Sequence, residues 1–190
     1  MEKKGKILSI VVPVYNEEGN ILELYDRLCK SMSIIGFSYQ FVFIDDGSKD
    51  SSYQLLKEIA EKDEKICVIT FSRNFGHHIA ITAGLDYAVG DYVVIMDGDL
   101  QDQPEEIEKL YNKLVTGYDV VYGLRIEKKF SWWRKLCSSL FLKFIRWMIQ
   151  EPIEINTTIF RIMTKQVVDE VKKLREQQRY IVGIIGWVGF

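Results

Sequence analysis

Short apolar runs alternate with amphipathic segments over residues 7–122. The apolar runs are rich in β-branched side chains and are typical of buried strands. The amphipathic segments carry apolar side chains at helical spacing, which is typical of helices packed on a sheet. Strands are therefore expected at residues 7–14, 40–45, 66–71, 92–97 and 119–122, and helices at residues 19–33, 50–62, 77–89 and 104–115.

This succession predicts an α/β fold with a mostly parallel central sheet and helices on both faces. In such sheets, ligands bind beyond the carboxyl ends of the strands. A polar motif follows each of four predicted strands, and any one of them alone is compatible with an ordinary turn. Four at one sheet edge predict a binding site. The motifs are Tyr15-Asn16-Glu17, Asp45-Asp46-Gly47-Ser48, Arg73-Asn74-Phe75-Gly76 and Asp97-Gly98-Asp99.

The last of these motifs predicts a metal site. Side chains two apart along an extended chain point the same way, so Asp97 and Asp99 leave the strand end on one side. Two converging carboxylates repel each other unless a cation joins them, and Mg²⁺ and Mn²⁺ prefer such oxygen ligands. Gly98 would let a ligand approach the backbone. The alternative is a polar turn between a strand and a helix.

Composition narrows the class of protein. The chain has 190 residues, of which 47% are hydrophobic and 27% charged, and this suits one globular domain. A net charge of −2 gives no reason to expect a nucleic-acid partner. The three widely spaced cysteines indicate reduced thiols in a cytosolic protein, and the adjacent His77 and His78 make a poor metal site. No run reaches the roughly 18 to 20 apolar residues that a membrane-spanning helix needs.

Four segments, in this order and spacing, resemble family 2 glycosyltransferases of the GT-A fold: VVPVYNEEGNI, FIDDGSKDSS, SRNFGHHIAITAGLDYA and MDGDLQDQPEEI. The likeness is strongest to the polyprenyl-phosphate branch, which includes dolichyl-phosphate mannose synthases and bactoprenol glucosyltransferases. It covers nearly the whole chain. The resemblance implies that residues 1–125 form a nucleotide-sugar and metal-binding core. Residues 126–190 would be the acceptor-side and membrane-interface segment of the same domain.

The resemblance also implies roles for the matching residues. Asp97, Asp99 and Gln101 would hold the cofactor, Mg²⁺ or Mn²⁺, at the diphosphate of a sugar nucleotide. Arg125 would join Asp97 and Asp99 in catalysis by stabilising the charge of the leaving diphosphate. The residues expected to bind the nucleotide sugar are Pro13, Tyr15, Glu17, Asp45, Asp46, Arg73, Asn74, Gly76, Asp97 and Gly98.

One stretch departs from this branch of the family. Its members commonly have an aspartate and then Gly-Asp before Phe-Arg, whereas this chain has Asn156-Thr157-Thr158-Ile159-Phe160-Arg161. An amide cannot act as a general base. A phosphate acceptor does not need one, because its second pKa of about 6 leaves it mostly dianionic at pH 7. The departure therefore favours a phosphate acceptor, with Asn156 and Arg161 on the acceptor side.

Residues 130–149 combine tryptophans and other apolar side chains at helical spacing with interspersed Lys and Arg. An amphipathic helix of this kind lies in a membrane interface, and its cations suit an anionic cytoplasmic leaflet. The alternative is a helix packed on protein. The first interpretation predicts a cytoplasmic protein that is peripheral to the inner face of the plasma membrane. The sequence is also compatible with a homo-oligomer.

Together these features predict an inverting glycosyltransferase that moves a sugar from a UDP-sugar to a polyprenyl (undecaprenyl) phosphate. A GDP-sugar is the alternative donor. One alternative takes a hydroxyl group of a glycan as acceptor. Another is a catalytically silent partner subunit that binds a sugar nucleotide, although the presence of Asp97, Asp99, Gln101 and Arg125 argues against it.

Overall fold

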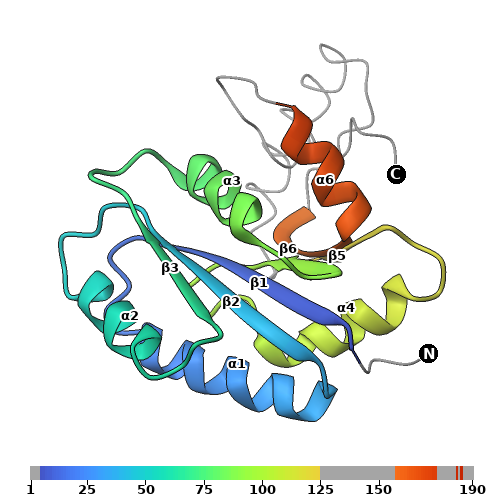
Figure 1. Cartoon of the computed structure of the whole chain (residues 1–190), viewed down its shortest axis with the longest axis horizontal. Coiled ribbons are helices and arrows are strands. Elements are labelled where there is room, and N and C mark those ends of the chain that lie inside the picture. Colours follow the sequence, from blue (N-terminus) through green and yellow to red (C-terminus); the bar gives the residue numbers. More distant parts are fainter. Residues whose placement is uncertain (1–4, 125–156, 175–182, 184, 186–190) are drawn as a thin grey trace, which may run out of the picture. The chain divides into compact units, whose positions relative to one another are not determined.

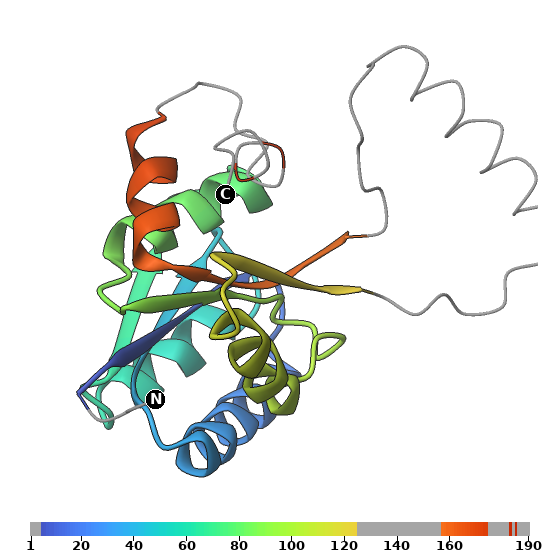
Figure 2. The same cartoon turned by 90° about the vertical axis from the view of Figure 1, so that its right-hand side faces the viewer.

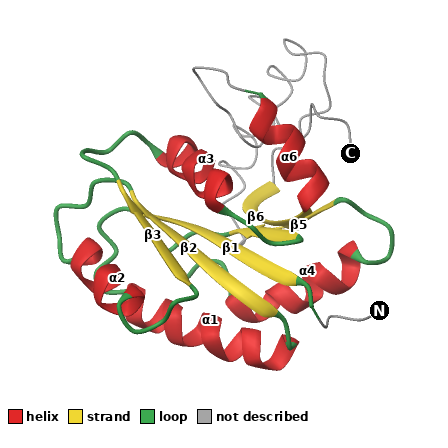
Figure 3. Cartoon of the chain, viewed as in Figure 1, coloured by secondary structure: helices red, strands yellow, loops and turns green. Residues whose placement is uncertain are grey.

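The structure, a computed structural model, describes residues 5–124, 157–174, 183 and 185. Helices and strands alternate along most of these residues, as Figure 1 and Figure 3 show. The strands are β1 (Ile7–Val14), β2 (Ser38–Asp45), β3 (Ile66–Thr70), β4 (Tyr92–Ile95), β5 (Val120–Leu124) and β6 (Thr157–Thr164). The helices are α1 (Ile21–Ile35), α2 (Ser52–Ala60), α3 (His77–Tyr87), the 3-10 helix η1 (Pro104–Glu106), α4 (Ile107–Leu114) and α6 (Lys165–Lys173).

The described strands form one sheet in the order β3-β2-β1-β4-β6-β5. β1 pairs in parallel with both β2 and β4, and β2 pairs in parallel with β3. β6 runs antiparallel to β4. The predicted α/β fold with a mostly parallel sheet is therefore confirmed.

Helices cover both faces of this sheet, as the turned view in Figure 2 shows. Neighbouring residues of β1 point to opposite faces. Leu8, Ile10 and Val12 share one buried cluster with α1, α2 and α4, while Val11 belongs to a second cluster with α3 and α6. α3 lies close to the sheet because Gly84 has no side chain. A Cβ at Gly84 would lie 2.4 Å from Cγ1 of Val11.

The register brings the ends of the parallel strands to one edge. Val14 of β1 lies opposite Asp45 of β2, and Asp45 lies opposite Thr70 of β3. On the other side of β1, Ile95 at the end of β4 lies opposite Val11. The loops that follow these four strands therefore gather at the carboxyl edge of the sheet, as the sequence predicted.

Some element boundaries differ from the prediction. β4 ends at Ile95 rather than Asp97, although the Met96 N–H still donates to Val11 O over 3.1 Å. The helix predicted from residue 104 begins as the 3-10 turn η1, and α4 follows at Ile107. β6 and α6 lie in a stretch where no element was predicted. The buried Val167, Val168 and Val171 of α6 nevertheless follow helical spacing.

By compactness the chain divides into two units, residues 1–122 with 159–190 and residues 123–158. In the second unit, the Thr158 hydroxyl donates to Gly123 O over 2.9 Å. Arg125, Asn156 and the helix predicted at 130–149 lie outside the described residues. None of the helices that the structure describes is both long and apolar enough to cross a membrane.

Candidate functional site

A cavity of about 480 Å³ lies at the carboxyl edge of the sheet, within the first unit. Its walls come from the loops after β1, β2, β3 and β4 and from the start of α3. The residues that line it are Pro13, Val14, Tyr15, Glu17, Asp46, Asn74, Gly76, His77, Ala80, Asp97, Gly98 and Asp99. All four polar motifs contribute to this lining, so the motifs that the sequence singled out form one site.

Hydrogen bonds join the loops after β1 and β2. The Asn16 N–H donates to Ser48 Oγ over 3.0 Å, and the Lys49 N–H donates to Asn16 Oδ1 over 2.8 Å. The Glu17 N–H donates to Ser52 Oγ over 2.8 Å. Asn16 adopts a left-handed φ of 56°, which asparagine tolerates better than most residues. These bonds fix the segment that presents Glu17 to the cavity.

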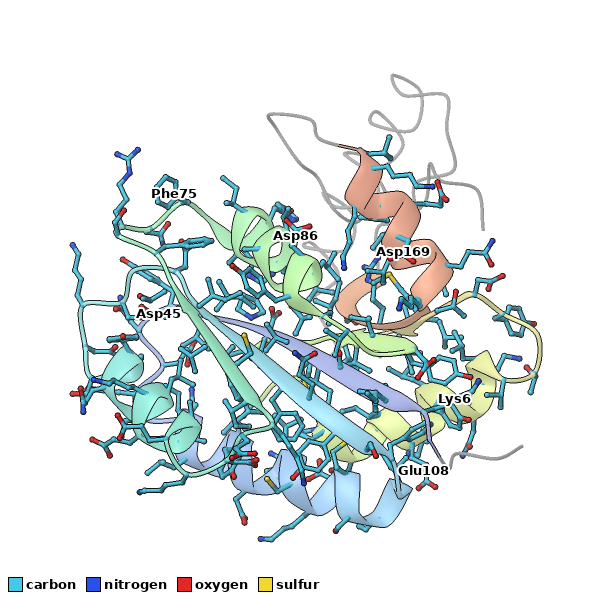
Figure 4. All side chains as sticks on the ribbon, in the orientation of Figure 1. Lys6, Asp45, Phe75, Asp86, Glu108 and Asp169 are labelled. Carbon is cyan, nitrogen blue, oxygen red and sulfur yellow. The ribbon has the colours of Figure 1, made fainter. Side chains whose placement is uncertain are left out.

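Asp45 is buried at the end of β2, where Figure 4 labels it. Its carboxylate accepts a hydrogen bond from the Ser48 N–H over 3.2 Å and another from the Thr70 hydroxyl over 2.9 Å. Both carboxylate oxygens thus bind the protein itself. Asp45 stabilises the turn that carries the second motif, and it is not part of the cavity lining.

Asp46 fixes the loop that leads into α3. Its buried carboxylate accepts from the N–H groups of Phe75 over 2.7 Å and Gly76 over 2.9 Å. Gly47 has a φ of +68°, and a Cβ there would lie 2.4 Å from the carbonyl carbon of Arg73. Only glycine therefore allows the loops after β2 and β3 to pack so closely.

The loop after β4 turns tightly, so that Asp97 and Asp99 both reach the cavity. The Asp97 N–H donates to the carboxylate of buried Asp102 over 3.2 Å. The Gln101 N–H donates to Asp99 Oδ1 over 3.0 Å. Leu100 has a φ of 61°, a strained conformation for leucine that this turn requires.

His77 is a cavity residue that sequence reasoning missed. It begins α3, and its Nε2 lies 3.4 Å from Asp97 Oδ1. Burial lowers the pKa of His77 below its usual 6.5, while the charges of Asp46 and Asp99 oppose that shift. The imidazole is therefore mainly neutral at pH 7. Adjacent helical residues diverge by about 100°, so His77 and His78 do not bind one metal ion as a pair. A role in the site for His77 alone, which directly follows the third motif, is compatible with this divergence.

The described lining of the cavity carries carboxylates and no lysine or arginine. The carboxylates belong to Glu17, Asp46, Asp97 and Asp99. A nucleoside diphosphate is itself an anion, so these charges would repel it unless a cation entered with it.

Asp97 and Asp99 fit such an ion, because Mg²⁺ is commonly held by one or two carboxylates together with substrate phosphates. Within the described part of the chain, no group of three or more His, Cys, Asp and Glu is placed to hold a metal. Phosphate and water oxygens would therefore have to complete the coordination of the ion.

Most of the residues predicted to bind a nucleotide sugar line the cavity, whereas Asp45 and Arg73 do not. Gln101, which was predicted to hold the metal, is also absent from the lining. The Arg73 guanidinium lies over the ring of Phe75, 4.9 Å from its centre, and Figure 4 shows Phe75 in the loop before α3. Gln101 is exposed beside the turn after β4. The binding roles of these residues stay predictions.

Two further site residues have structural roles of their own. Gly98 lines the cavity, but a Cβ there would also lie 3.3 Å from Pro13 O, so packing between two loops favours glycine as well. Arg161 is buried on β6, and its Nε donates to Ile159 O over 3.1 Å. Its acceptor-side role stays a prediction.

Comparison with known proteins places the chain in a family. The family model described as Glycosyl transferase family 2 matches residues 9–175. The uncharacterized glycosyltransferase YkcC of Bacillus subtilis is 45% identical over 183 residues, which cover 96% of this chain and 57% of that protein. The undecaprenyl-phosphate 4-deoxy-4-formamido-L-arabinose transferase of Aeromonas hydrophila is 34% identical over 177 residues, which cover 93% of this chain and 54% of that protein. The chain thus spans little more than half the length of these relatives.

Solved structures show the same fold. Glucosyl-3-phosphoglycerate synthase from Mycobacterium tuberculosis, in complex with UDP, aligns with a TM-score of 0.60 at 21% identity, over 88% of this chain and 60% of that one. A structure of that enzyme with Mn²⁺, UDP and phosphoglyceric acid aligns with a TM-score of 0.59 at 20% identity, over 88% of this chain and 59% of that one. The predicted GT-A fold is confirmed, and the chain belongs to glycosyl transferase family 2.

Proposed function

We propose that this chain is the transferring unit of an inverting, metal-dependent glycosyltransferase that moves a sugar from a UDP-sugar to a polyprenyl phosphate. The observation that carries the proposal is the cavity at the carboxyl edge, where Asp97 and Asp99 stand together in a lining without lysine or arginine among its described residues. The cavity volume of about 480 Å³ is within the range of small-molecule sites.

The donor nucleotide would lie between the loops after β1 and β3. Tyr15 is 40% exposed in the cavity wall and offers an aromatic ring to a base, while the Asn74 amide offers both a donor and an acceptor. The carboxylate oxygens of Asp46 have lone pairs beyond the two that accept from the backbone. Asp46 can therefore fix the loop before α3 and still accept a hydrogen bond from a nucleotide.

The chemistry follows from the charges at this site. An oxygen of the acceptor phosphate attacks the anomeric carbon while the bond from that carbon to the diphosphate breaks, so UDP leaves and the configuration inverts. A divalent ion held by Asp97 and Asp99 would offset the charge that develops on the diphosphate. The protein contributes the fixed turn that presents both carboxylates, and we propose that Arg125 acts on the same charge.

Two observations support a phosphate acceptor. The Aeromonas relative, which its name describes as an undecaprenyl-phosphate transferase, matches nearly the whole chain. Ile159 stands where this branch of the family commonly has an aspartate, and its side chain packs on the apolar cluster around α3 and α6. A dianionic phosphate needs no general base at that position.

The proposal places the protein on the cytoplasmic face of the plasma membrane. It rests on the Trp, Lys and Arg content of residues 130–149. In a flotation assay, the chain should bind anionic vesicles better than neutral ones, and salt should weaken binding. Replacing Trp132 and Trp133 with serine should reduce vesicle binding without changing UDP affinity. Equal binding to anionic and neutral vesicles would contradict the membrane part of the proposal.

The decisive experiment measures UDP release from a panel of UDP-sugars with Mn²⁺ or Mg²⁺, with GDP-sugars tested in parallel. Undecaprenyl phosphate, a glycan with free hydroxyl groups, and no acceptor form the three arms. Release that requires undecaprenyl phosphate would support the proposal. Release only with the glycan would favour a hydroxyl acceptor instead, and nucleotide binding without release in any arm would favour a silent partner subunit.

A further inference from the structure

His77 lies against one of the two carboxylates on which the proposed metal site depends. Its side chain lines the cavity with 40% of its surface exposed, and Nε2 lies 3.4 Å from Oδ1 of Asp97, whose side chain is 29% exposed. Within the described lining, His77 is the one side chain that can carry a positive charge. The other polar side chains of the lining are carboxylates, a phenol and an amide.

The start of α3 holds His77 in place. The Asp46 carboxylate binds the N–H groups of the two residues before His77, and the Ala80 N–H donates back to Gly76 O over 3.2 Å. Farther along α3, Gly84 allows the helix to pack directly on the sheet. The imidazole is therefore attached to the start of a helix that is held by the loop after β2 and, farther along, by close packing on the sheet.

Asp97 is held equally firmly from its own side. The Met96 N–H continues the sheet by donating to Val11 O, and the Asp97 N–H donates to the Asp102 carboxylate. These bonds fix the backbone of Asp97, but they leave the two torsions of its side chain to be set by other contacts. His77 makes such a contact.

We infer that His77 is a positioning residue, which holds the Asp97 carboxylate in the orientation that binds the divalent ion together with Asp99. The inference rests on the proposed metal-dependent transfer. A carboxylate that is already oriented loses less side-chain entropy when it binds an ion. An imidazole with its proton on Nε2 would also reduce the repulsion between the two carboxylates. Partners of this kind commonly set the affinity of a metal site.

The test measures Mn²⁺ binding in the presence of saturating UDP, from the electron paramagnetic resonance signal of free Mn²⁺. His77→Ala should weaken Mn²⁺ binding by about 10- to 100-fold. His77→Gln should keep most of the affinity, because the glutamine amide places an N–H close to the position of Nε2. His78→Gln is the matched control and should bind Mn²⁺ like the wild type, since His78 does not line the cavity. Circular dichroism and thermal midpoints check that each variant is folded.

The outcomes separate this inference from the proposed function. A wild-type chain that binds no Mn²⁺ with UDP would overturn the proposed function and the inference with it. Wild-type binding that His77→Ala leaves unchanged would overturn the inference alone. Equal losses in His77→Ala and His77→Gln, with the nitrogen coupling of a directly bound imidazole in pulsed spectra, would overturn positioning in favour of His77 as a metal ligand.

Discussion

The amino and carboxyl edges of the sheet are both polar, but they differ in what their polar groups bind. At the amino edge, Asp91 accepts from the Ile7 N–H over 2.9 Å. The buried Ser9 hydroxyl donates to Gln40 Oε1 over 2.7 Å and accepts from the Gly90 N–H over 2.9 Å. These groups bind one another, and none of their residues lines the cavity.

The carboxyl edge has an excess of negative charge. Asp45 and Asp46 bind backbone or hydroxyl donors of the protein, as the polar groups of the amino edge do. Asp46, Asp97 and Asp99 all line a cavity whose described lining has no lysine or arginine. The carboxylates that bind donors of the protein stabilise the fold, and the excess of carboxylates in the cavity lining supports the proposed cation site.

The largest expected effect is on binding, from Asp99→Asn. We expect it to weaken Mn²⁺-dependent UDP binding by about 100-fold or more, since losing a ligand costs at least as much as losing an outer partner. Stability should change by less than about 0.5 kcal/mol, because asparagine Oδ1 can still accept from Gln101 N–H. Isothermal titration with and without EDTA measures the effect.

Asp91→Asn is the matched control at the amino edge and should leave UDP affinity unchanged. If EDTA does not alter the UDP affinity of the wild type, the excess carboxylates are not a metal site, and the contrast between the two edges loses its functional meaning.

Asp46→Ala should affect both stability and binding. It removes the acceptor of two partly buried backbone N–H groups, and losing these hydrogen bonds to a carboxylate costs about 1 to 3 kcal/mol of unfolding free energy. UDP affinity should also fall, because the loop before α3 is released. Asp46→Asn should lose less stability and less UDP affinity, since its amide oxygen can still accept from one of the two N–H groups. Urea denaturation that finds Asp46→Ala as stable as the wild type would refute the structural role.

The position of the site could be predicted from the sequence because it depends on local patterns. Apolar runs identified β1 to β5 to within a few residues, and the parallel topology follows from their alternation with helices. Parallel strands end at one edge, so the motifs after β1 to β4 had to meet. This inference needs no knowledge of side-chain contacts.

The internal partners of the site could not be predicted, because they depend on how loops pack on each other. The sequence marked Asp45 and Asp46 as ligand-binding residues, yet their carboxylates also bind groups brought near by the close approach at Gly47. His77 meets Asp97 only because α3 packs on the sheet over β1 and β2, which brings its first residue near the loop after β4. β6 inserts antiparallel next to β4, a long-range pairing that local patterns do not specify.

Ser9→Ala tests the complete pairing at the amino edge. The change removes one acceptor and one donor in a buried position, and it should cost about 1 to 2 kcal/mol of unfolding free energy. Ser31→Ala is the matched control, because the buried Ser31 hydroxyl has no hydrogen-bond partner in the described part of the chain. It should be neutral or slightly stabilising. Neither variant should alter UDP affinity, and urea denaturation with UDP titration would expose a departure from this pattern.

The smallest expected effect concerns a carboxylate whose partner is a cation of the protein. Arg27 Nε and Nη2 donate to the two carboxylate oxygens of Glu105 over 2.9 and 2.7 Å. The hydrogen bond from Arg27 lowers the pKa of Glu105 below its usual 4.5. Because the Glu105 side chain is 50% exposed, Glu105→Gln should cost only about 0.2 to 1 kcal/mol at pH 7.

The sign of the pH dependence follows from the lowered pKa. A carboxylate with a depressed pKa in the folded state contributes its full stability above pH 4.5, and loses it as pH falls through the folded-state value. The difference in thermal midpoint between wild type and Glu105→Gln should therefore be constant from pH 7 to about pH 5 and shrink below pH 4. High salt should also shrink it. A difference that grows as pH falls would show that Glu105 is not stabilised by Arg27, and that carboxylates away from the cavity are not paired as the comparison of the two edges requires.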